Sequence, residues 1–132
     1  EGLGKEMGFY QDPYSDFGRL STELWRAVRL VTHTGLHAKR WSREEAIDYF
    51  RQNSLLSERD IVKEVERYIT NPGQATSYKI GELKIEELRD KARAALGDRF
   101  DIKAFHAVVL GSGSVPLDVL EEQVNAWIAT RT

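Results

Sequence analysis

Helical periodicity runs along almost the whole chain and is interrupted only at turn residues, and this feature restricts the fold most. Apolar residues recur three or four positions apart, which is the spacing of one face of an α-helix. Strand patterns are nearly absent, since the run 107–110 is short and lies inside a helical period. The sequence therefore predicts an all-α fold, a multi-helix bundle of six or seven helices, in a single unit over residues 1–132.

Start and stop signals give the positions of the predicted helices. Ser42 and Glu45 form a capping box, and Ser57 begins the next helix in a similar way. A Pro-Gly turn at 71–73 ends that helix and leads into a long one. The predicted elements are a helical stub over 1–8, a long helix over 14–39, helices that begin near 42 and 57, a long helix over 74–96, and helices that begin near 101 and 116.

Composition removes several classes of function. The formal net charge is −2, and acidic and basic residues are interleaved, so the basic surplus of a nucleic-acid-binding protein is missing. The chain has no cysteine, which excludes disulfides, thiol nucleophiles and cysteine-based zinc sites. No apolar run approaches the ~20 residues of a membrane span, and no signal peptide is visible. The compartment, cytoplasmic or exported, stays open.

The first residues of the chain suggest that a longer protein precedes them. Residue 1 is Glu1, and the stretch 1–8 reads as the end of a helix without an N-cap. We therefore expect the chain to begin inside a longer protein. The missing N-terminal part would then be a partner that packs on the apolar faces of this chain.

Two polar pairs on the predicted helix 14–39 are candidates for binding. His33 and His37 are four residues apart, the spacing of a two-histidine metal half-site, but no acidic residue lies between them as a zincin motif requires. The alternative is two unrelated polar histidines. Arg26 and Arg29 could form a fork that holds a carboxylate. The alternative is an arginine that covers apolar surface and pairs with a nearby glutamate.

The stretch 71–81 is the least ordinary in the chain. Its Pro-Gly turn leads directly into a helix, whose first turn presents free backbone N–H groups. Tyr78 lies about one turn inside that helix, where its hydroxyl could donate to a developing oxyanion, and Gln74 could orient a substrate. The alternative is a tyrosine half-buried between helices. The segment 111–116 lacks the Gly-Lys-Ser/Thr ending of a phosphate loop, so we interpret it as a connection between helices.

Several short motifs, taken in order, resemble one protein family. They are Glu1-Gly-Leu-Gly-Lys-Glu-Met-Gly, Leu24-Trp-Arg-Ala-Val-Arg-Leu-Val, Thr34-Gly-Leu-His37, Trp41-Ser-Arg-Glu-Glu-Ala, Arg67-Tyr, Pro72-Gly-Gln-Ala, Ser77-Tyr-Lys-Ile-Gly81, Phe105-His106, and Gly113 with Pro116-Leu117. Over nearly the whole chain this order resembles the C-terminal end of a bacterial family catalogued as domain of unknown function 885. The resemblance implies that the chain is the C-terminal segment of a larger, zincin-like helical metallopeptidase.

The resemblance also implies that the zinc ligands lie outside this chain. In the family, a His-Glu-x-x-Pro-Gly-His helix supplies two ligands and a catalytic glutamate, and a later Glu-Gly-Trp stretch supplies the third. Both would precede residue 1. Glu1 resembles the acidic residue that closes the Glu-Gly-Trp helix, and it would orient a ligand instead of binding zinc. We therefore expect no metal site or cofactor in this fragment. Zinc, which activates water for attack on a carbonyl, is implied for the parent protein.

By the same resemblance, this fragment would form the other wall of a cleft that binds a peptide-like substrate. In similar helical metallopeptidases, a tyrosine from a C-terminal helix stabilises the oxyanion, and Tyr78 matches that role. The residues that the resemblance suggests for substrate binding are Arg29, His37, Gln74 and His106. From its sequence context alone, His106 is also interpretable as a core histidine. The family often has Asp where this chain has His33, which weakens any role for that position.

Two hypotheses follow from the sequence. In the first, the chain is part of a zinc-dependent hydrolase and is inactive alone. In the second, it is a non-catalytic helical module for protein interaction or assembly, whose exposed apolar faces bind a partner or form a dimer.

Overall fold

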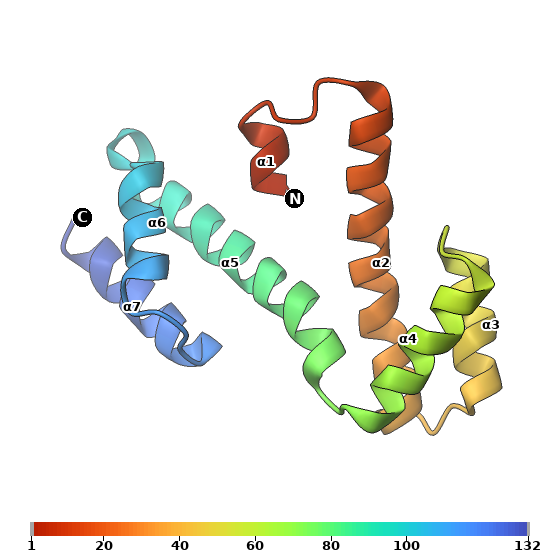
Figure 1. Ribbon diagram of the computed structural model, residues 1–132. Helices are drawn as coiled ribbons and strands as arrows, with labels where there is room; N and C mark the ends of the chain where they lie inside the picture. Colours follow the sequence, from red (N-terminus) through yellow and green to blue (C-terminus); the bar gives the residue numbers. More distant parts are fainter. Residues whose placement is uncertain (1, 132) are drawn as a thin grey trace. The chain divides into compact units, whose positions relative to one another are not determined.

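The computed structural model describes residues 2–131, and within that range it is built from helices without a β-strand (Figure 1). This confirms the predicted all-α, multi-helix bundle. The helices are α1 (Gly2–Glu6), α2 (Pro13–Ala38), α3 (Arg43–Asn53), α4 (Glu58–Thr70), α5 (Gln74–Leu96), a 3-10 turn η1 (Gly97–Arg99), α6 (Ile102–Gly111) and α7 (Leu117–Ala129). None of these helices is both long enough and apolar enough to cross a lipid bilayer.

The helices form two compact units, residues 1–79 and residues 80–132. The boundary between the units falls inside α5, and each unit has its own hydrophobic core. The single unit over 1–132 that the sequence suggests stays a prediction. The role suggested for Glu1 concerns a position outside the described residues.

Side-chain caps start the helices where the sequence predicts. In the capping box of α3, Ser42 Oγ accepts a hydrogen bond from the Glu45 backbone N–H, and Glu45 Oε2 accepts one from the Ser42 N–H at 2.7 Å. The Ser57 side chain accepts a hydrogen bond from the Asp60 backbone N–H and caps α4. The Asp101 side chain accepts one from the Lys103 backbone N–H and caps α6. The helix predicted to begin near 116 starts at Leu117. Pro116 lies just before it as the N-cap, with an extended ψ of 151°, and its carbonyl accepts the Leu120 N–H.

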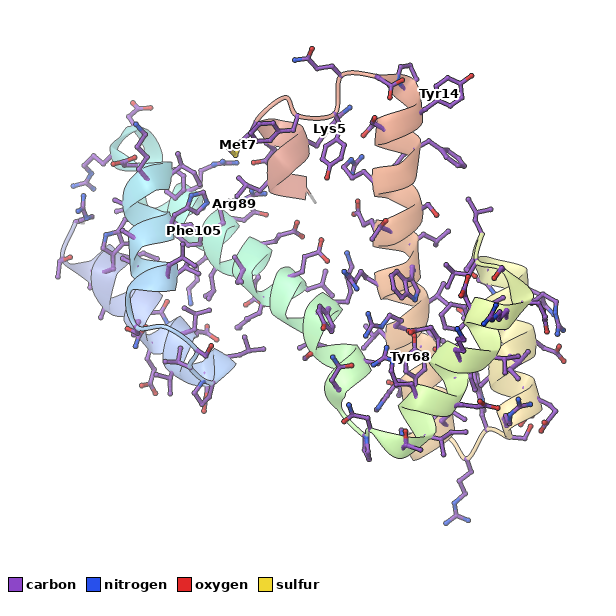
Figure 2. All side chains as sticks on the ribbon, in the orientation of Figure 1. Lys5, Met7, Tyr14, Tyr68, Arg89 and Phe105 are labelled. Atoms are coloured by element: carbon purple, nitrogen blue, oxygen red, sulfur yellow. The ribbon has the colours of Figure 1, made fainter. Side chains whose placement is uncertain are left out.

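The core of the first unit lies where α3 and α4 pack on the second half of α2. Every buried residue of α2 falls at or after Val28. Tyr68 of α4 is fully buried there, between α4 and α2 (Figure 2). The first half of α2 carries no buried residue, and Lys5 of α1 forms a 2.7 Å ion pair with its Asp16. The buried apolar members of this core are Val28, Ala46, Ile47, Phe50, Ile61, Val65, Tyr68 and Ala75.

The core of the second unit forms between α5, α6 and α7. Phe105 of α6 is fully buried in it, and Leu88 and Ala92 face it from α5. Leu120 and Val124 contribute from α7, as the helical spacing predicts. Figure 2 shows Phe105 on the inner side of α6.

A row of apolar side chains on α2 remains exposed. Its members, which we call the α2 stripe, are Phe17, Leu20, Leu24 and Val31. They lie on one face of the helix because their spacing is three, four and seven residues. Phe17 is 60% exposed, so this face has no cover within the first unit.

Candidate functional site

A glycine turn leads into α5 and anchors its first residues to α2. Gly73 has φ +85°, a left-handed conformation that glycine adopts without steric cost. Its backbone N–H donates a 2.9 Å hydrogen bond to Nε2 of His33 on α2. The turn is therefore held by a buried imidazole, and α5 starts at Gln74 with its first turn against the core of the first unit.

Gln74 connects two arginines with Tyr78. Its Oε1 accepts from Arg67 Nη1 at 2.7 Å and from Arg29 Nη2 at 3.4 Å, while its Nε2 donates to the Tyr78 hydroxyl at 3.0 Å. Guanidinium groups only donate, so they fix which end of the amide faces Tyr78. The Tyr78 oxygen therefore accepts, and its own proton is left to donate to another group. We call Arg67, Gln74 and Tyr78 the Gln74 relay.

Arg29 is a buried cation surrounded by aromatic rings. It is only 3% exposed. Its Cζ lies 4.6 Å from the ring centre of Tyr78, 5.3 Å from that of Trp25 and 5.8 Å from that of Tyr68. Arg26 adds a second guanidinium 4.7 Å from the same Tyr78 ring. Ring faces attract cations, and they support the guanidinium planes while leaving the N–H edges to bind acceptors.

Glu64 is the carboxylate at the centre of this cluster. Its Oε2 accepts from Arg67 Nη2 at 2.8 Å and from the Tyr68 hydroxyl at 2.7 Å. Burial alone would raise the pKa of Glu64, but the hydrogen bonds from Arg67 and Tyr68 outweigh it and hold this pKa below its ordinary value. Burial and the bond to Glu64 raise the pKa of Tyr68, so its hydroxyl remains a protonated donor.

The two histidines of α2 lie together, with ring centres 4.4 Å apart. His33 Nε2 accepts from Gly73, and His37 Nε2 lies 2.8 Å from the Tyr68 carbonyl, to which it can only donate. Both Nε2 atoms are thus engaged by backbone groups. Residues 2–131 contain no group of three or more His, Cys, Asp or Glu side chains that could hold a metal ion. These backbone contacts favour two structural histidines over a metal half-site.

The structure brings together three of the five site residues suggested by the sequence. Tyr78, Gln74 and Arg29 are in direct contact. His37 lies one α-helical turn from His33 and contacts the neighbouring backbone of α4. His106 belongs to the second unit, where its ring centre lies 6.0 Å from that of Phe105. The binding and catalytic roles of all five stay predictions.

Sequence reasoning did not identify two residues that complete this cluster. Glu64 and Arg67 are three apart on α4 and form an ion pair at 2.8 Å. That spacing is a recognisable helical pair. The spacing does not indicate, however, that the Arg67 guanidinium also binds Gln74 on α5.

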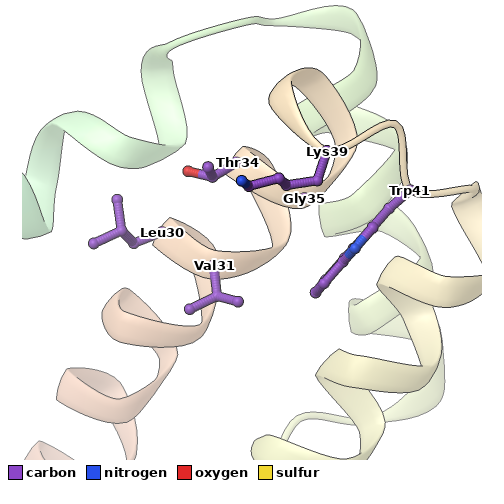
Figure 3. Close-up of a pocket in the computed structure, with 6 residues that line it drawn as sticks. All are labelled: Leu30, Val31, Thr34, Gly35, Lys39 and Trp41. Carbon is purple, nitrogen blue, oxygen red and sulfur yellow. The ribbon is translucent and has the colours of Figure 1, made fainter.

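A separate hollow lies at the C-terminal end of α2 (Figure 3). It has a volume of about 350 Å³ and includes Val31 of the α2 stripe. None of the predicted site residues lines it. It is lined by Leu30, Val31, Thr34, Gly35, Lys39 and Trp41.

These features define an all-α protein with a buried arginine–tyrosine cluster and, within residues 2–131, no metal-binding group. The chain belongs to DUF885, a family described as bacterial proteins of unknown function, whose sequence profile matches residues 1–124.

A solved structure is similar over almost the whole chain. It is described as "the putative lipoprotein from Colwellia psychrerythraea" and is 52% identical, with a TM-score of 0.95. The match covers 98% of this chain but only 22% of that chain. This chain therefore corresponds to less than a quarter of the length of that solved protein. No curated protein matches.

Proposed function

We propose that this chain is the C-terminal helical portion of a zinc-dependent, metallopeptidase-type hydrolase, to which it contributes oxyanion-stabilising and substrate-binding residues. The observation that supports this best is the Gln74 relay, because it leaves the Tyr78 proton free to donate. Tyr78 is 45% exposed, so a substrate can reach its hydroxyl. By itself the chain would be inactive.

Residues 2–131 offer no group of three or more His, Cys, Asp or Glu side chains for zinc, so in this proposal the metal is held by the remainder of the parent protein. That remainder is the partner that the proposal requires. The similar solved structure supports its existence, since the matched part is 22% of that chain. Zinc would supply the activation of water.

Tyr78 would act on the oxygen of the bond being hydrolysed. In peptide hydrolysis the amide C–N bond breaks, the hydroxyl of water joins the carbonyl carbon, and a proton goes to the leaving amine. Negative charge develops on the carbonyl oxygen before the bond breaks. A hydrogen bond from the Tyr78 hydroxyl stabilises that charge more than it stabilises the neutral carbonyl, and this difference increases the rate.

The proposal is tested by Tyr78→Phe in the protein at its natural length. We expect kcat for a hydrolysed synthetic peptide to fall at least about tenfold, because one lost oxyanion donor costs roughly 10²–10³ in kcat in a known case. KM should change little. Tyr14→Phe, at an exposed tyrosine of α2, is the matched control and should keep kcat. An unchanged kcat in Tyr78→Phe would remove Tyr78 from the mechanism.

A second variant tests the direction of the hydrogen bonds. In Gln74→Glu both arginines keep an acceptor, but a carboxylate cannot donate to Tyr78. The Tyr78 proton would then turn toward residue 74, and kcat should fall as in Tyr78→Phe. Normal helicity by circular dichroism would show that the fold is retained. A Gln74→Glu protein with full kcat would contradict the role of the relay.

The α2 stripe favours the alternative hypothesis, a helical module for assembly. Contiguous exposed apolar surface commonly marks an interaction site. If a second copy covers the stripe, sedimentation equilibrium of the chain should show a dimer, and Leu24→Lys should return it to a monomer. Lys63→Glu, a charge change on exposed α4 surface, is the control. A monomer for the unaltered chain at all concentrations would argue against self-assembly.

A further inference from the structure

The positive charge of Arg29 is only partly neutralised. Its nearest carboxylate oxygen is Glu64 Oε2, 4.0 Å from Arg29 Nε. That oxygen already accepts from Arg67 and Tyr68 at 2.8 and 2.7 Å. Arg29 Nε makes no hydrogen bond to the described residues. One carboxylate is therefore shared by two guanidinium groups, and Arg67 has the closer contact.

The hydrogen bond of Arg29 to Gln74 does not compensate for this. The bond is long, 3.4 Å, and its acceptor is a neutral amide oxygen that also accepts from Arg67 at 2.7 Å. Removing a guanidinium from water is costly unless close, charged acceptors replace the water. A buried polar group without its full set of partners needs an explanation in a native structure, and a bound ion or ligand is one such explanation.

The surroundings of Arg29 limit which anion fits. Ring faces of Tyr78 and Trp25 lie against the guanidinium, so an acceptor has to approach along its N–H edge. A planar carboxylate matches that edge with two parallel hydrogen bonds.

Tyr78 relates this site to the bond that would be hydrolysed. The Arg29 Cζ lies 4.6 Å from the Tyr78 ring centre. Successive residues of a peptide are about 3.8 Å apart. The Tyr78 hydroxyl and Arg29 Nη2 also contact the two ends of one amide group, that of Gln74, at 3.0 Å and 3.4 Å. A substrate whose carbonyl oxygen meets the Tyr78 hydroxyl would thus bring a group one residue further along toward Arg29.

We propose that Arg29 binds the terminal carboxylate of the substrate, so that the protein hydrolyses the last peptide bond of chains with a free C-terminus. This proposal rests on the function proposed above. Arg29 then determines specificity, while Tyr78 acts on the rate of the chemical step. The products are a shortened peptide and one free amino acid, with water as the co-reactant.

A matched pair of substrates tests the proposal in the protein at its natural length. N-acetyl-dialanine and N-acetyl-dialanine amide contain the same peptide bond and differ in the charge at the C-terminus. We expect kcat/KM for the acid to exceed that for the amide at least about tenfold, mainly through KM. Equal kcat/KM values would overturn the carboxylate site and leave the proposed hydrolase function intact.

Variants then assign the preference to Arg29. In Arg29→Met the ratio of kcat/KM for the acid to kcat/KM for the amide should fall to about one. Arg51→Met, which removes an exposed arginine paired with Glu58 on α4, is the control and should keep the preference. Tyr78→Phe should reduce kcat for both substrates and keep their ratio. An acid preference that survives in Arg29→Met would overturn the assignment.

Binding measurements separate this proposal from the hydrolase proposal. If neither compound is hydrolysed, calorimetry should still show tighter binding of N-acetyl-dialanine than of its amide, and Arg29→Met should abolish the difference. That result would support the carboxylate site and reject the hydrolase function, whereas equal or absent binding would reject both. If Arg29→Met does not fold, Arg29→Lys retains the charge without the two-pronged edge and should weaken the preference.

Discussion

At the scale of single residues, His33 connects the protonation of one side chain with the geometry of the site. Its neutral Nε2 accepts the Gly73 N–H of the turn that starts α5. His37 and Arg29 of α2, Tyr68 of α4 and the backbone of the turn surround it. Burial, followed by the proximity of His37 and Arg29, lowers the pKa of His33 below its ordinary value of 6.5, although a hydrogen bond with Asn71 opposes this.

This lowered pKa predicts a pH dependence of stability. Below the ordinary pKa of 6.5, the unfolded chain binds a proton at His33 more readily than the folded chain does. Stability therefore rises with pH in this range. The contribution of His33 is complete above pH 6.5 and is lost as the pH falls toward the folded-state pKa. We expect the free energy of unfolding to decrease between pH 7 and pH 5, by less than about 1.4 kcal/mol per pH unit from this group.

Urea unfolding followed by circular dichroism at several pH values measures this effect. His33→Gln keeps an acceptor for the Gly73 N–H but does not titrate, so its stability should depend less on pH over the same range. Comparing the two proteins at pH 8 gives the cost of the substitution alone. Parallel curves for the two proteins would contradict the role of His33.

The sequence was sufficient to choose three members of this cluster, Arg29, Gln74 and Tyr78, but not to connect them. The Pro-Gly turn and the helix start at 74 are local features, so Gln74 and Tyr78 could be selected from them. The contacts of Gln74 with Arg29 and Arg67 depend on the packing of α2, α4 and α5. A pattern along one helix contains no information about that packing. Glu64 and Arg67 were therefore not identified as members of this cluster.

At the scale of elements, helix boundaries were predictable because their signals are local. The caps at Ser42, Ser57 and Asp101 each start the expected helix, and α5 has the predicted limits. Burial was less predictable. The periodicity of α2 marks an apolar face, but it does not say whether another element covers that face. In the first half of α2, no residue is buried.

The junction between α2 and α3 depends on the missing side chain of Gly35. A Cβ built on this residue would overlap the indole of Trp41. The backbone N–H of Trp41 also donates a 3.0 Å hydrogen bond to the Gly35 carbonyl. Gly35→Ala should therefore push Trp41 away and destabilise the chain by about 1–3 kcal/mol, the usual cost of overpacking. Urea unfolding measures this difference.

Gly18→Ala is the matched control in the same helix. Nothing lies within 4 Å of a Cβ at that position, so the substitution brings only a better helix propensity. We expect it to be neutral or stabilising by up to about 1 kcal/mol. Equal effects of the two substitutions on the free energy of unfolding would show that Trp41 does not restrict the size of the side chain at position 35.

At the scale of the whole chain, the two cores can be perturbed separately. Phe105 is fully buried in the second unit. Phe105→Ala should destabilise that unit by about 3–5 kcal/mol, the common cost of removing a large buried aromatic side chain. Fluorine NMR of 5-fluorotryptophan-labelled protein in urea gives the measurement, since Trp127 packs on this core and Trp25 and Trp41 on the other.

The same experiment tests the predicted single unit. If the chain unfolds as one unit, the unfolding transitions reported by all three tryptophans should move together to lower urea concentrations in Phe105→Ala. A shift confined to Trp127 would show that the two cores unfold independently. A Trp127 transition that stays where it is in the unaltered protein would contradict the structural importance of Phe105.

Helix α2 fixes the distance between the α2 stripe and Arg29. The helix has 26 residues, which corresponds to about 39 Å at roughly 1.5 Å per residue. Leu20 of the α2 stripe and Arg29 lie nine positions apart on this continuous helix, a rise of about 13.5 Å. A helix is stiff along its axis, so a body that docks on the stripe is held at a fixed distance from the guanidinium. An insertion or deletion of one residue between them would rotate the two surfaces by about 100° relative to each other, so the number of residues between Leu20 and Arg29 is itself a structural constraint.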